Sequence, residues 1–214
     1  MTDSIFGGVI IGKQIEAAVL TTLEQWFPVY IRYMELELGL DQDVLPLPRS
    51  FITTDKIQRE NTDQLPAIVC VSPGLSGRNS PKQEGDGTFR VPFAISIGVF
   101  VGGKDRSSTK DLVRYYTGVC RMIMLQKQKL GGIADGTTWL DESYDDNFAF
   151  VDQQTIGAGS VIFEVWVAGA VNRFGGPASY GQGPPAPDPD TQPGETWPEA
   201  EEVIANITTL DGGS

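Results

Sequence analysis

The sequence predicts an α+β fold in which a largely antiparallel sheet carries helices packed on one face. The chain has 214 residues, of which 40% are hydrophobic, enough for one core of ordinary size. Helix-like and strand-like patterns occur in separate runs, without the regular alternation typical of a parallel sheet. From residue 175 onward, proline and acidic residues replace these patterns and predict a disordered or extended tail. We therefore place a folded domain at residues 1–174 and a proline-rich acidic C-terminal tail at residues 175–214.

Helical periodicity marks the N-terminal part of the domain. Apolar residues recur every three or four positions from about Ser4 to Phe27, which predicts an amphipathic helix. Pro28 lacks an amide hydrogen and fits the first turn of a helix, so we expect it to end this helix and begin a second one. The second helix is predicted to run to Leu38 and to stop at Gly39.

Strand patterns fill the middle of the domain. Short strands are predicted at residues 50–54 and 67–71, and the Gly-, Ser- and Pro-rich segment 72–88 is expected to be one long loop. Residues 89–101 alternate between large apolar side chains and mainly small ones, the clearest strand pattern in the chain. Pro92 cannot donate a ladder hydrogen bond, so this strand is predicted to be an edge or to carry a bulge there.

A helix and two strands complete the predicted domain. The residues from Ser108 to Asp111 have the pattern of a capping box, and apolar residues continue at helical spacing to Leu125. Further strands are predicted at residues 138–146 and 160–171. Both faces of the last strand are largely apolar, so we expect it in the centre of the sheet.

The composition argues against several classes of function. The chain has a net charge of −12 and no histidine, which disfavours a basic nucleic-acid groove and removes imidazole-based catalysis. Cys70 and Cys120 form no C-x-x-C pair, so we expect both to be reduced and buried. The N-terminus does not resemble a leader, and no apolar run matches a membrane span, so we expect a protein made in a cytoplasm.

No motif points to catalysis. Residues 102–105 lack the spacing of a phosphate-binding loop and are better explained as a strand-to-helix turn. No serine or cysteine has a base beside it. The densest acidic patch offers carboxylates to a hard cation, but a charged strand edge explains it better. This patch comprises Asp141, Glu142, Asp145, Asp146 and Asp152. We therefore predict a protein that is not an enzyme and has no catalytic, cofactor-binding or metal-binding residues.

Binding surface is the alternative that the sequence offers. Segment 72–88 and the strand after it carry three cations, Arg78, Lys82 and Arg90, which suit an acidic partner but are also common as solubility features. Small residues form one face of the strand at 89–101; they are Ala94, Ser96 and Gly98.

The tail regains large apolar residues near its end, which a linker does not need. These residues are Val203, Ile204, Ile207 and Leu210. Two interpretations stay open at this point: a frayed terminus, or a short strand that docks on a neighbouring subunit or partner.

Four short patterns occur between Gly12 and Phe174. They are Trp26-Phe27-Pro28 with Tyr30 and Arg32, Leu45-Pro46-Leu47-Pro48-Arg49-Ser50-Phe51, Gln64-Leu65-Pro66-Ala67-Ile68-Val69 running to Ser72-Pro73-Gly74, and the closing stretch from Val165 to Phe174. Together they resemble tail terminator proteins of long-tailed, siphovirus-type phages of actinobacteria. The order of helices and strands is also similar to the terminator fold, whereas the acidic tail departs from the family pattern.

This resemblance implies a virion protein of the phage neck that assembles in the host cytoplasm. Such a protein forms a ring, expected to be a homohexamer, on the tail tube protein, stops tube growth and meets the head-closure or connector protein. DNA would pass through the lumen without sequence-specific binding, and no membrane is involved. Under this hypothesis Arg78, Lys82 and Arg90 meet the tube, and the small-residue face or the sheet edge contributes to subunit contacts.

Two rival functions remain open at the level of sequence. Another neck component, a head-closure or adaptor protein, forms rings in the same place, although adaptor proteins are dominated by helices. A metal-dependent hydrolase would use the acidic patch, and a shift in melting temperature with Mg²⁺, Mn²⁺ or Ca²⁺ would favour it.

Overall fold

The computed structural model describes residues 10–42, 44–53, 62–85, 87–145, 148–151 and 153–172. In this part of the chain two α-helices accompany a seven-stranded sheet. The helices are α1 (Gly12–Glu37) and α2 (Arg106–Gln126), with short 3-10 turns η1 (Thr62–Gln64) and η2 (Leu130–Gly132). The strands are β1 (Ser50–Ile52), β2 (Ala67–Leu75), β3 (Lys82–Gln83), β4 (Thr88–Gly103), β5 (Gly136–Tyr144), β6 (Ala149–Val151) and β7 (Gln154–Asn172).

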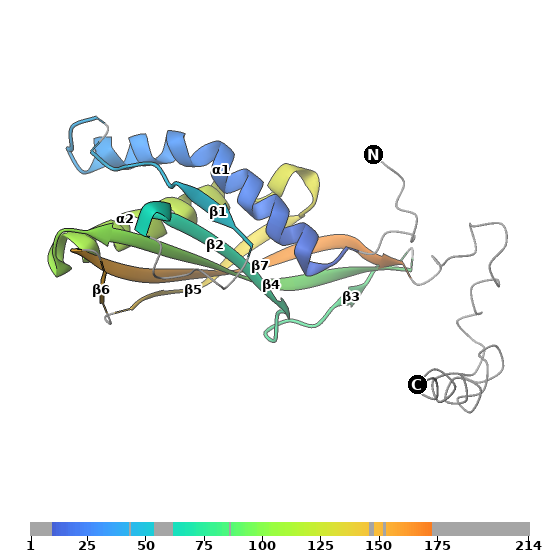
Figure 1. Cartoon of the computed structure of the whole chain (residues 1–214). Coiled ribbons are helices and arrows are strands. Elements are labelled where there is room, and N and C mark those ends of the chain that lie inside the picture. The colour runs from blue at the N-terminus through green and yellow to red at the C-terminus, as the bar shows by residue number, and fades with distance from the viewer. Residues whose placement is uncertain are drawn as a thin grey trace, which may run out of the picture.

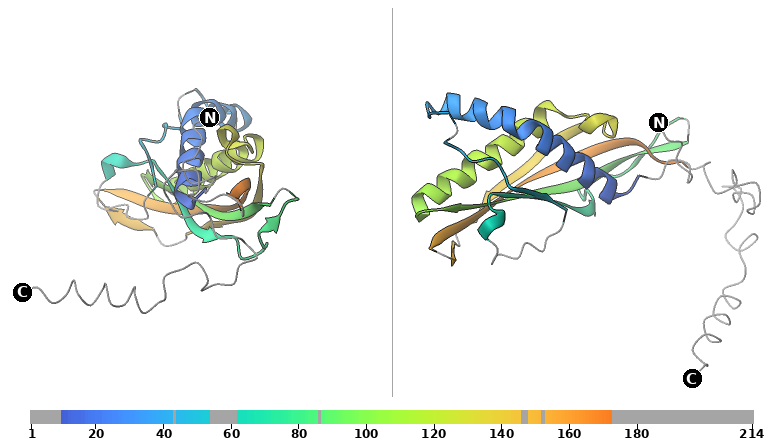
Figure 2. Two further views of the ribbon diagram at one scale, coloured as in Figure 1. Left: turned by 90° about the vertical axis from the view of Figure 1, so that its right-hand side faces the viewer. Right: turned by 45° about the horizontal axis from the view of Figure 1, so that its top comes forward.

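The sheet is mostly antiparallel, as predicted. Its order is β1-β2-β4-β7-β5, with β3 paired to β4 and β6 paired to β7, and β1 alone runs parallel to its neighbour β2 among the described strands. Both helices lie on one face of the sheet (Figure 1; Figure 2, left). β4 and β7 form its centre as a long two-stranded ribbon that pairs Thr88 with Asn172 at one end and Gly103 with Thr155 at the other. The predicted central position of the last strand is therefore confirmed.

The core lies between this ribbon and the two helices. The large alternating residues of β4, from Val91 to Val101, are buried beneath the helices, as are Val161 and Phe163 of β7. Phe27 of α1 packs on Tyr116 of α2, with ring centres 5.7 Å apart. The period-two pattern of the sequence is thus explained by burial of one face of each strand.

The first helix departs from the prediction at two points. It begins at Gly12 rather than near Ser4, because Ile11 has extended backbone and donates its N–H to the Gln14 side chain. It also continues through Pro28 to Glu37, so the predicted break is wrong. Pro28 lies on the exposed side of the helix, while the buried residues before and after it form one continuous apolar face. Gly39 follows the helix with a φ of 65°, which confirms the predicted stop.

The second helix begins earlier than predicted. Asp105 rather than Ser108 caps α2, because the Asp105 carboxylate accepts the Ser108 N–H at 2.9 Å while the Ser108 hydroxyl lies 3.3 Å from the Asp105 N–H. The capping interaction is therefore three residues upstream of the predicted one. Residues 102–105 form the predicted turn between β4 and α2.

Pro92 lies at the interruption that the sequence predicted for β4. Pairing with β2 ends at Phe93, pairing with β3 begins at Arg90, and the register with β7 shifts between Phe89 and Val91. The proline therefore lies where it does not have to donate a ladder hydrogen bond.

Two features of the sheet, β6 and the parallel pairing of β1, were not predicted from the sequence. Neither helix in the described ranges is long and apolar enough to cross a membrane. The predicted boundary at Phe174 and the tail 175–214 lie outside the described residues.

Candidate functional site

Segment 72–88, predicted to be one long loop, is partly incorporated in the sheet. β2 continues to Leu75 after a register shift between Val71 and Gly74, and Lys82–Gln83 pairs with β4 as β3. The prediction of a single loop is wrong because these backbone groups find partners on β4. What remains between the strands is the β2–β3 loop, residues 76–81.

The β2–β3 loop folds across the sheet face that the helices leave open (Figure 1). Ser76 N–H donates to the Pro92 carbonyl at 2.8 Å, and the Asn79 amide group lies 2.8 and 3.1 Å from the two carboxylate oxygens of Glu164. Glu164 is only 1% exposed, on the central strand β7. A buried carboxylate needs hydrogen-bond donors, so the Asn79 amide both fixes the loop and stabilises β7.

The three predicted cations do not behave alike. Lys82 Nζ and Arg90 Cζ lie 5.5 and 5.4 Å from the centre of the Trp166 ring, in cation–π geometry. Arg90 Nε is also 3.2 Å from the Asp135 carboxylate. Arg78 does not share this contact and lies exposed on the β2–β3 loop. The structure therefore brings Lys82 and Arg90 together and leaves Arg78 accessible to a partner.

The small residues of β4 lie on the same helix-free face. Ala94 pairs with Glu164, Ser96 with Ile162, and Gly98 with Ser160 of β7, and all three small residues are half-buried. This face carries both polar and small apolar residues, and the β2–β3 loop covers it at Glu164.

α1 carries apolar side chains on its outer side as well as on its buried side. Val29, Tyr33 and Leu36 are 56%, 51% and 77% exposed, and the half-buried Trp26 precedes them at the same spacing. Intervals of three and four residues place all four on one side of the helix. We name these four residues the α1 stripe. The stripe extends across Pro28, where the sequence predicts a helix to end, so it was not recognised from the sequence.

A second apolar surface lies at an edge of the sheet, whereas the α1 stripe lies on the outside of the helix layer, where Trp26, Val29 and Tyr33 line one cavity with Gln126 of α2. α1 packs against β1 and β2, whereas β5 and β6 form the other edge. Trp139 and Tyr144 of β5 and Phe150 of β6 are exposed, Phe150 at 73%. We name these three residues the β5–β6 edge. The sequence signal for it was weak, because the three aromatics fall on two strands of which only one was predicted.

The acidic patch is divided by the sheet and partly neutralised. Asp141 pairs with Ile162 and Glu142 with Val161, on opposite faces of β7. Glu142 accepts hydrogen bonds from Arg121, at 2.5 Å, and from the Tyr144 hydroxyl. Asp146 and Asp152 lie outside the described residues. Among the described residues no group of three or more acidic, cysteine or histidine side chains could hold a metal ion.

The two cysteines are buried and unbridged, as predicted. Cys70 faces α2 from β2, and Cys120 lies within α2. Burial raises the pKa of both thiols well above the ordinary value, because an apolar environment disfavours the thiolate. Neither thiol is therefore prepared for nucleophilic chemistry.

No family model matches the chain, and no curated protein matches it. The candidate site thus rests on the geometry of three surfaces: the α1 stripe, the β5–β6 edge and the β2–β3 loop. The four apolar tail residues predicted to dock, Val203, Ile204, Ile207 and Leu210, lie outside the described residues.

Proposed function

We propose that this chain is a structural virion protein that forms a ring on the tail tube of a long-tailed phage. The ring ends tail growth and joins the tail to the head-completion proteins. The observation that carries this proposal is a pair of unlike apolar surfaces on two different sides of one small domain: the α1 stripe on the outside of the helix layer, and the β5–β6 edge at one edge of the sheet. Exposed apolar patches of this kind are typical of protein interfaces. The four short patterns that resemble tail terminator proteins support the same function.

Unlike surfaces on two sides of a subunit favour head-to-tail assembly. In such an assembly the α1 stripe of one copy contacts the β5–β6 edge of the next copy. The assembly closes into a ring when the rotation between neighbouring copies is a whole fraction of a full turn. We propose six copies, as the resemblance implies. The net charge of −12 suits a lumen through which DNA slides without binding.

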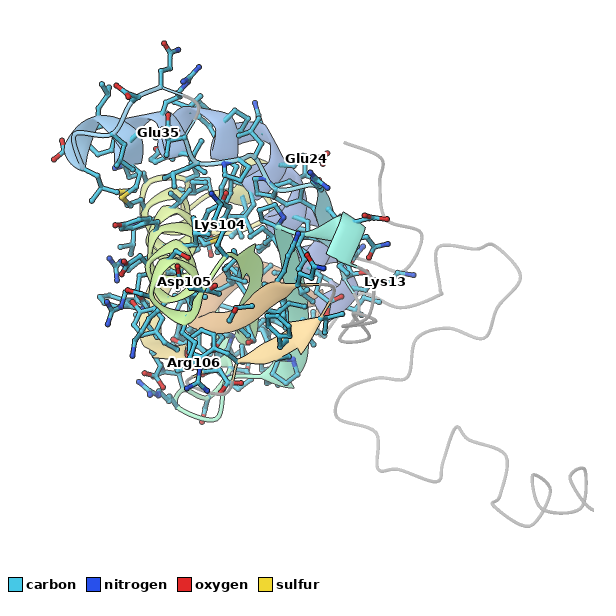
Figure 3. All side chains as sticks on the ribbon, turned by 60° about the vertical axis from the view of Figure 1, so that its left-hand side comes forward. Lys13, Glu24, Glu35, Lys104, Asp105 and Arg106 are labelled. Atoms are coloured by element: carbon cyan, nitrogen blue, oxygen red, sulfur yellow. The ribbon has the colours of Figure 1, made fainter. Side chains whose placement is uncertain are left out.

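The β2–β3 loop is the proposed contact with the tail tube protein. Arg78 is its exposed cation, whereas Lys82 and Arg90 are occupied by Trp166 and Asp135. Deleting the whole loop would also remove the donor to Glu164, so a point change gives a cleaner test. We expect Arg78→Glu to leave circular dichroism unchanged and to abolish capping of purified tubes, measured as uncontrolled tube length by electron microscopy. Lys104→Glu, an exposed charge at the start of α2, is the control (Figure 3). Normal capping by Arg78→Glu would remove the loop from the tube interface.

The ring itself is tested by imaging the neck of the intact particle by electron microscopy and fitting this chain to the density. We expect a sixfold ring between the tail tube and the head-closure protein. If the chain instead fits the density next to the portal, the protein is an adaptor. If the chain fits nowhere in the neck, the proposed function is wrong.

A further inference from the structure

An apolar groove lies at the end of the sheet where both termini leave the described domain. The groove has a volume of about 540 Å³. Its floor is the helix-facing side of β4, and its walls come from the start of α1, the end of β2 and the end of β7. The lining residues include Ile11, Leu75, Pro81, Phe89, Phe93 and Val171.

The groove exists because the central ribbon is longer than the helix layer above it. α1 begins only at Gly12, so β4 residues before Phe93 and the last residues of β7 extend beyond the helix layer (Figure 1). The alternating pattern of β4 continues into this region, which keeps Phe89 on the face that is core elsewhere. Leu75, at one side of the groove, remains 53% exposed. Apolar surface in a concave site of this kind favours an apolar occupant.

We propose that residues 203–210 of the same chain dock in this groove and cover it. The segment holds four large apolar residues, and its chain departs from the groove itself, since Val171 lines the wall and Asn172 is the last described residue. Thirty residues separate Asn172 from Val203. A flexible linker of this length has a root-mean-square end-to-end distance of about 30 Å, which is enough to bring residues 203–210 back to the groove. Such a tether gives an effective concentration on the order of millimolar.

Charge complementarity selects this segment. The groove wall contains the N-terminal end of α1, which has no acidic residue in its first turn and carries the exposed Lys13 (Figure 3). A helix N-terminus and a lysine together attract negative charge. The docking segment is flanked by Glu199, Glu201 and Glu202 on one side and by Asp211 on the other. The other terminal segment, residues 1–9, has a single acid, Asp3, and is therefore the weaker candidate.

Hydrogen exchange of the full-length chain, followed by mass spectrometry, tests the proposal first. We expect amides of residues 203–210 to exchange about tenfold more slowly in the native protein than in Leu75→Asp. Phe150→Asp is the matched control, because it also places a charge at an exposed apolar position but on the distant β5–β6 edge. Lys13→Glu is expected to reduce the protection of the same amides in part. Equal exchange in the native chain and Leu75→Asp would overturn the proposal, as would protection confined to residues 1–9.

A disulfide test distinguishes the same chain from a second copy. Leu75→Cys combined with Ile207→Cys is expected to oxidise to a bridge within one chain, seen as a faster monomer band on a non-reducing gel. The native thiols do not interfere because both are buried. Leu36→Cys with Ile207→Cys is the control, since Leu36 is exposed at the other end of α1. Bridges of equal yield in the control, or bridged dimers in place of monomers at micromolar concentration, would overturn docking within one chain. Both experiments use the isolated protein, so their outcome is independent of whether it forms a ring.

Discussion

At the scale of single residues, buried carboxylates determine how the connections are attached to the domain. Glu164 holds the β2–β3 loop through Asn79, and Glu35 accepts the Leu45 N–H at 2.8 Å and so attaches the segment after α1 to that helix. Both carboxylates are almost fully buried. Each needs its donor, because an unsatisfied buried charge is expensive and is not stabilised by water. The β2–β3 loop and the segment after α1 therefore have fixed positions on the domain, although the sequence pattern of each is that of a loop.

Asn79→Ala removes the donor of Glu164, and we expect it to lower the free energy of unfolding by about 1–3 kcal/mol. The same change releases the loop, so trypsin should cleave after the exposed Arg78 several times faster than in the native protein. Urea unfolding and a timed digest measure the two effects. Ser80→Ala, on the same loop, is the control. A stable variant with native cleavage would show that Glu164 does not depend on the loop.

Asp105 gives the fold a pH-dependent contribution. Its hydrogen bonds to Ser108 lower the pKa of the carboxyl below the ordinary aspartate value. A carboxyl whose pKa is lower in the folded state stabilises the fold above the unfolded pKa, near 3.9, and loses this effect as the pH falls through the folded pKa. We therefore expect Asp105→Ala to unfold at lower urea concentration at pH 6, and the difference to shrink toward pH 3. A difference that is independent of pH would contradict the capping role.

At the scale of elements, α2 and β7 are in close contact. A Cβ on Gly159 would lie 2.7 Å from a methyl group of Val113 and 3.2 Å from the Ser143 carbonyl oxygen, and one on Gly157 would lie 2.8 Å from Thr109. Glycine therefore lets the helix approach the sheet at these two positions. The backbone of β7, rather than its side chains, forms the floor beneath the first half of α2.

Gly159→Ala should push α2 away from the sheet, and we expect a loss of about 1–3 kcal/mol in the free energy of unfolding. Gly77→Ala is the control, because a Cβ there meets nothing within 4 Å. Urea denaturation of the two variants measures the difference. Equal free energies of unfolding for the two variants would mean that α2 and β7 can move apart at Gly159 without destabilising the fold.

The sequence predicted elements wherever local pattern and burial agree. β4, and β7 from Val161 to Val167, have large apolar residues at every second position, and these residues are buried in the core. Prediction failed where tertiary contacts outweighed local signals: the buried face of α1 continues across Pro28, and β4 pairs with part of segment 72–88. Pairing across strands is invisible in one sequence, so the approach of Lys82 and Arg90 to Trp166 could not be foreseen. The candidate surfaces were therefore predicted only in part.

At the scale of the whole molecule, the two apolar surfaces predict that copies assemble head to tail. Mixing two variants, each with one damaged surface, tests this prediction. Leu36→Asp damages the α1 stripe and Phe150→Asp damages the β5–β6 edge. Either variant alone should remain monomeric. Mixed in equal amounts they should form a dimer that grows no further, because one intact copy of each surface remains for a single contact. Light scattering coupled to size-exclusion chromatography measures the masses.

The control for this mixture is Leu47→Asp, which alters an exposed apolar residue of the segment between α1 and β1, away from both surfaces. This variant should assemble as the native protein does. If the free native chain is monomeric, the same comparison is made on purified tail tubes. Rescue of neither variant by the other would contradict a head-to-tail contact between these two surfaces.

The long central ribbon also governs how a newly made chain acquires its fold. Every pair between β4 and β7 joins residues separated by α2, β5 and β6, so the centre of the sheet cannot close until the last strand has been synthesised. Contacts between residues so distant along the chain form slowly, whereas α2 can form from local contacts alone. β4 therefore stays without its β7 neighbour while the 50 residues between Gly103 and Gln154 are synthesised. A protein built in this way depends on the rate at which its final strand emerges.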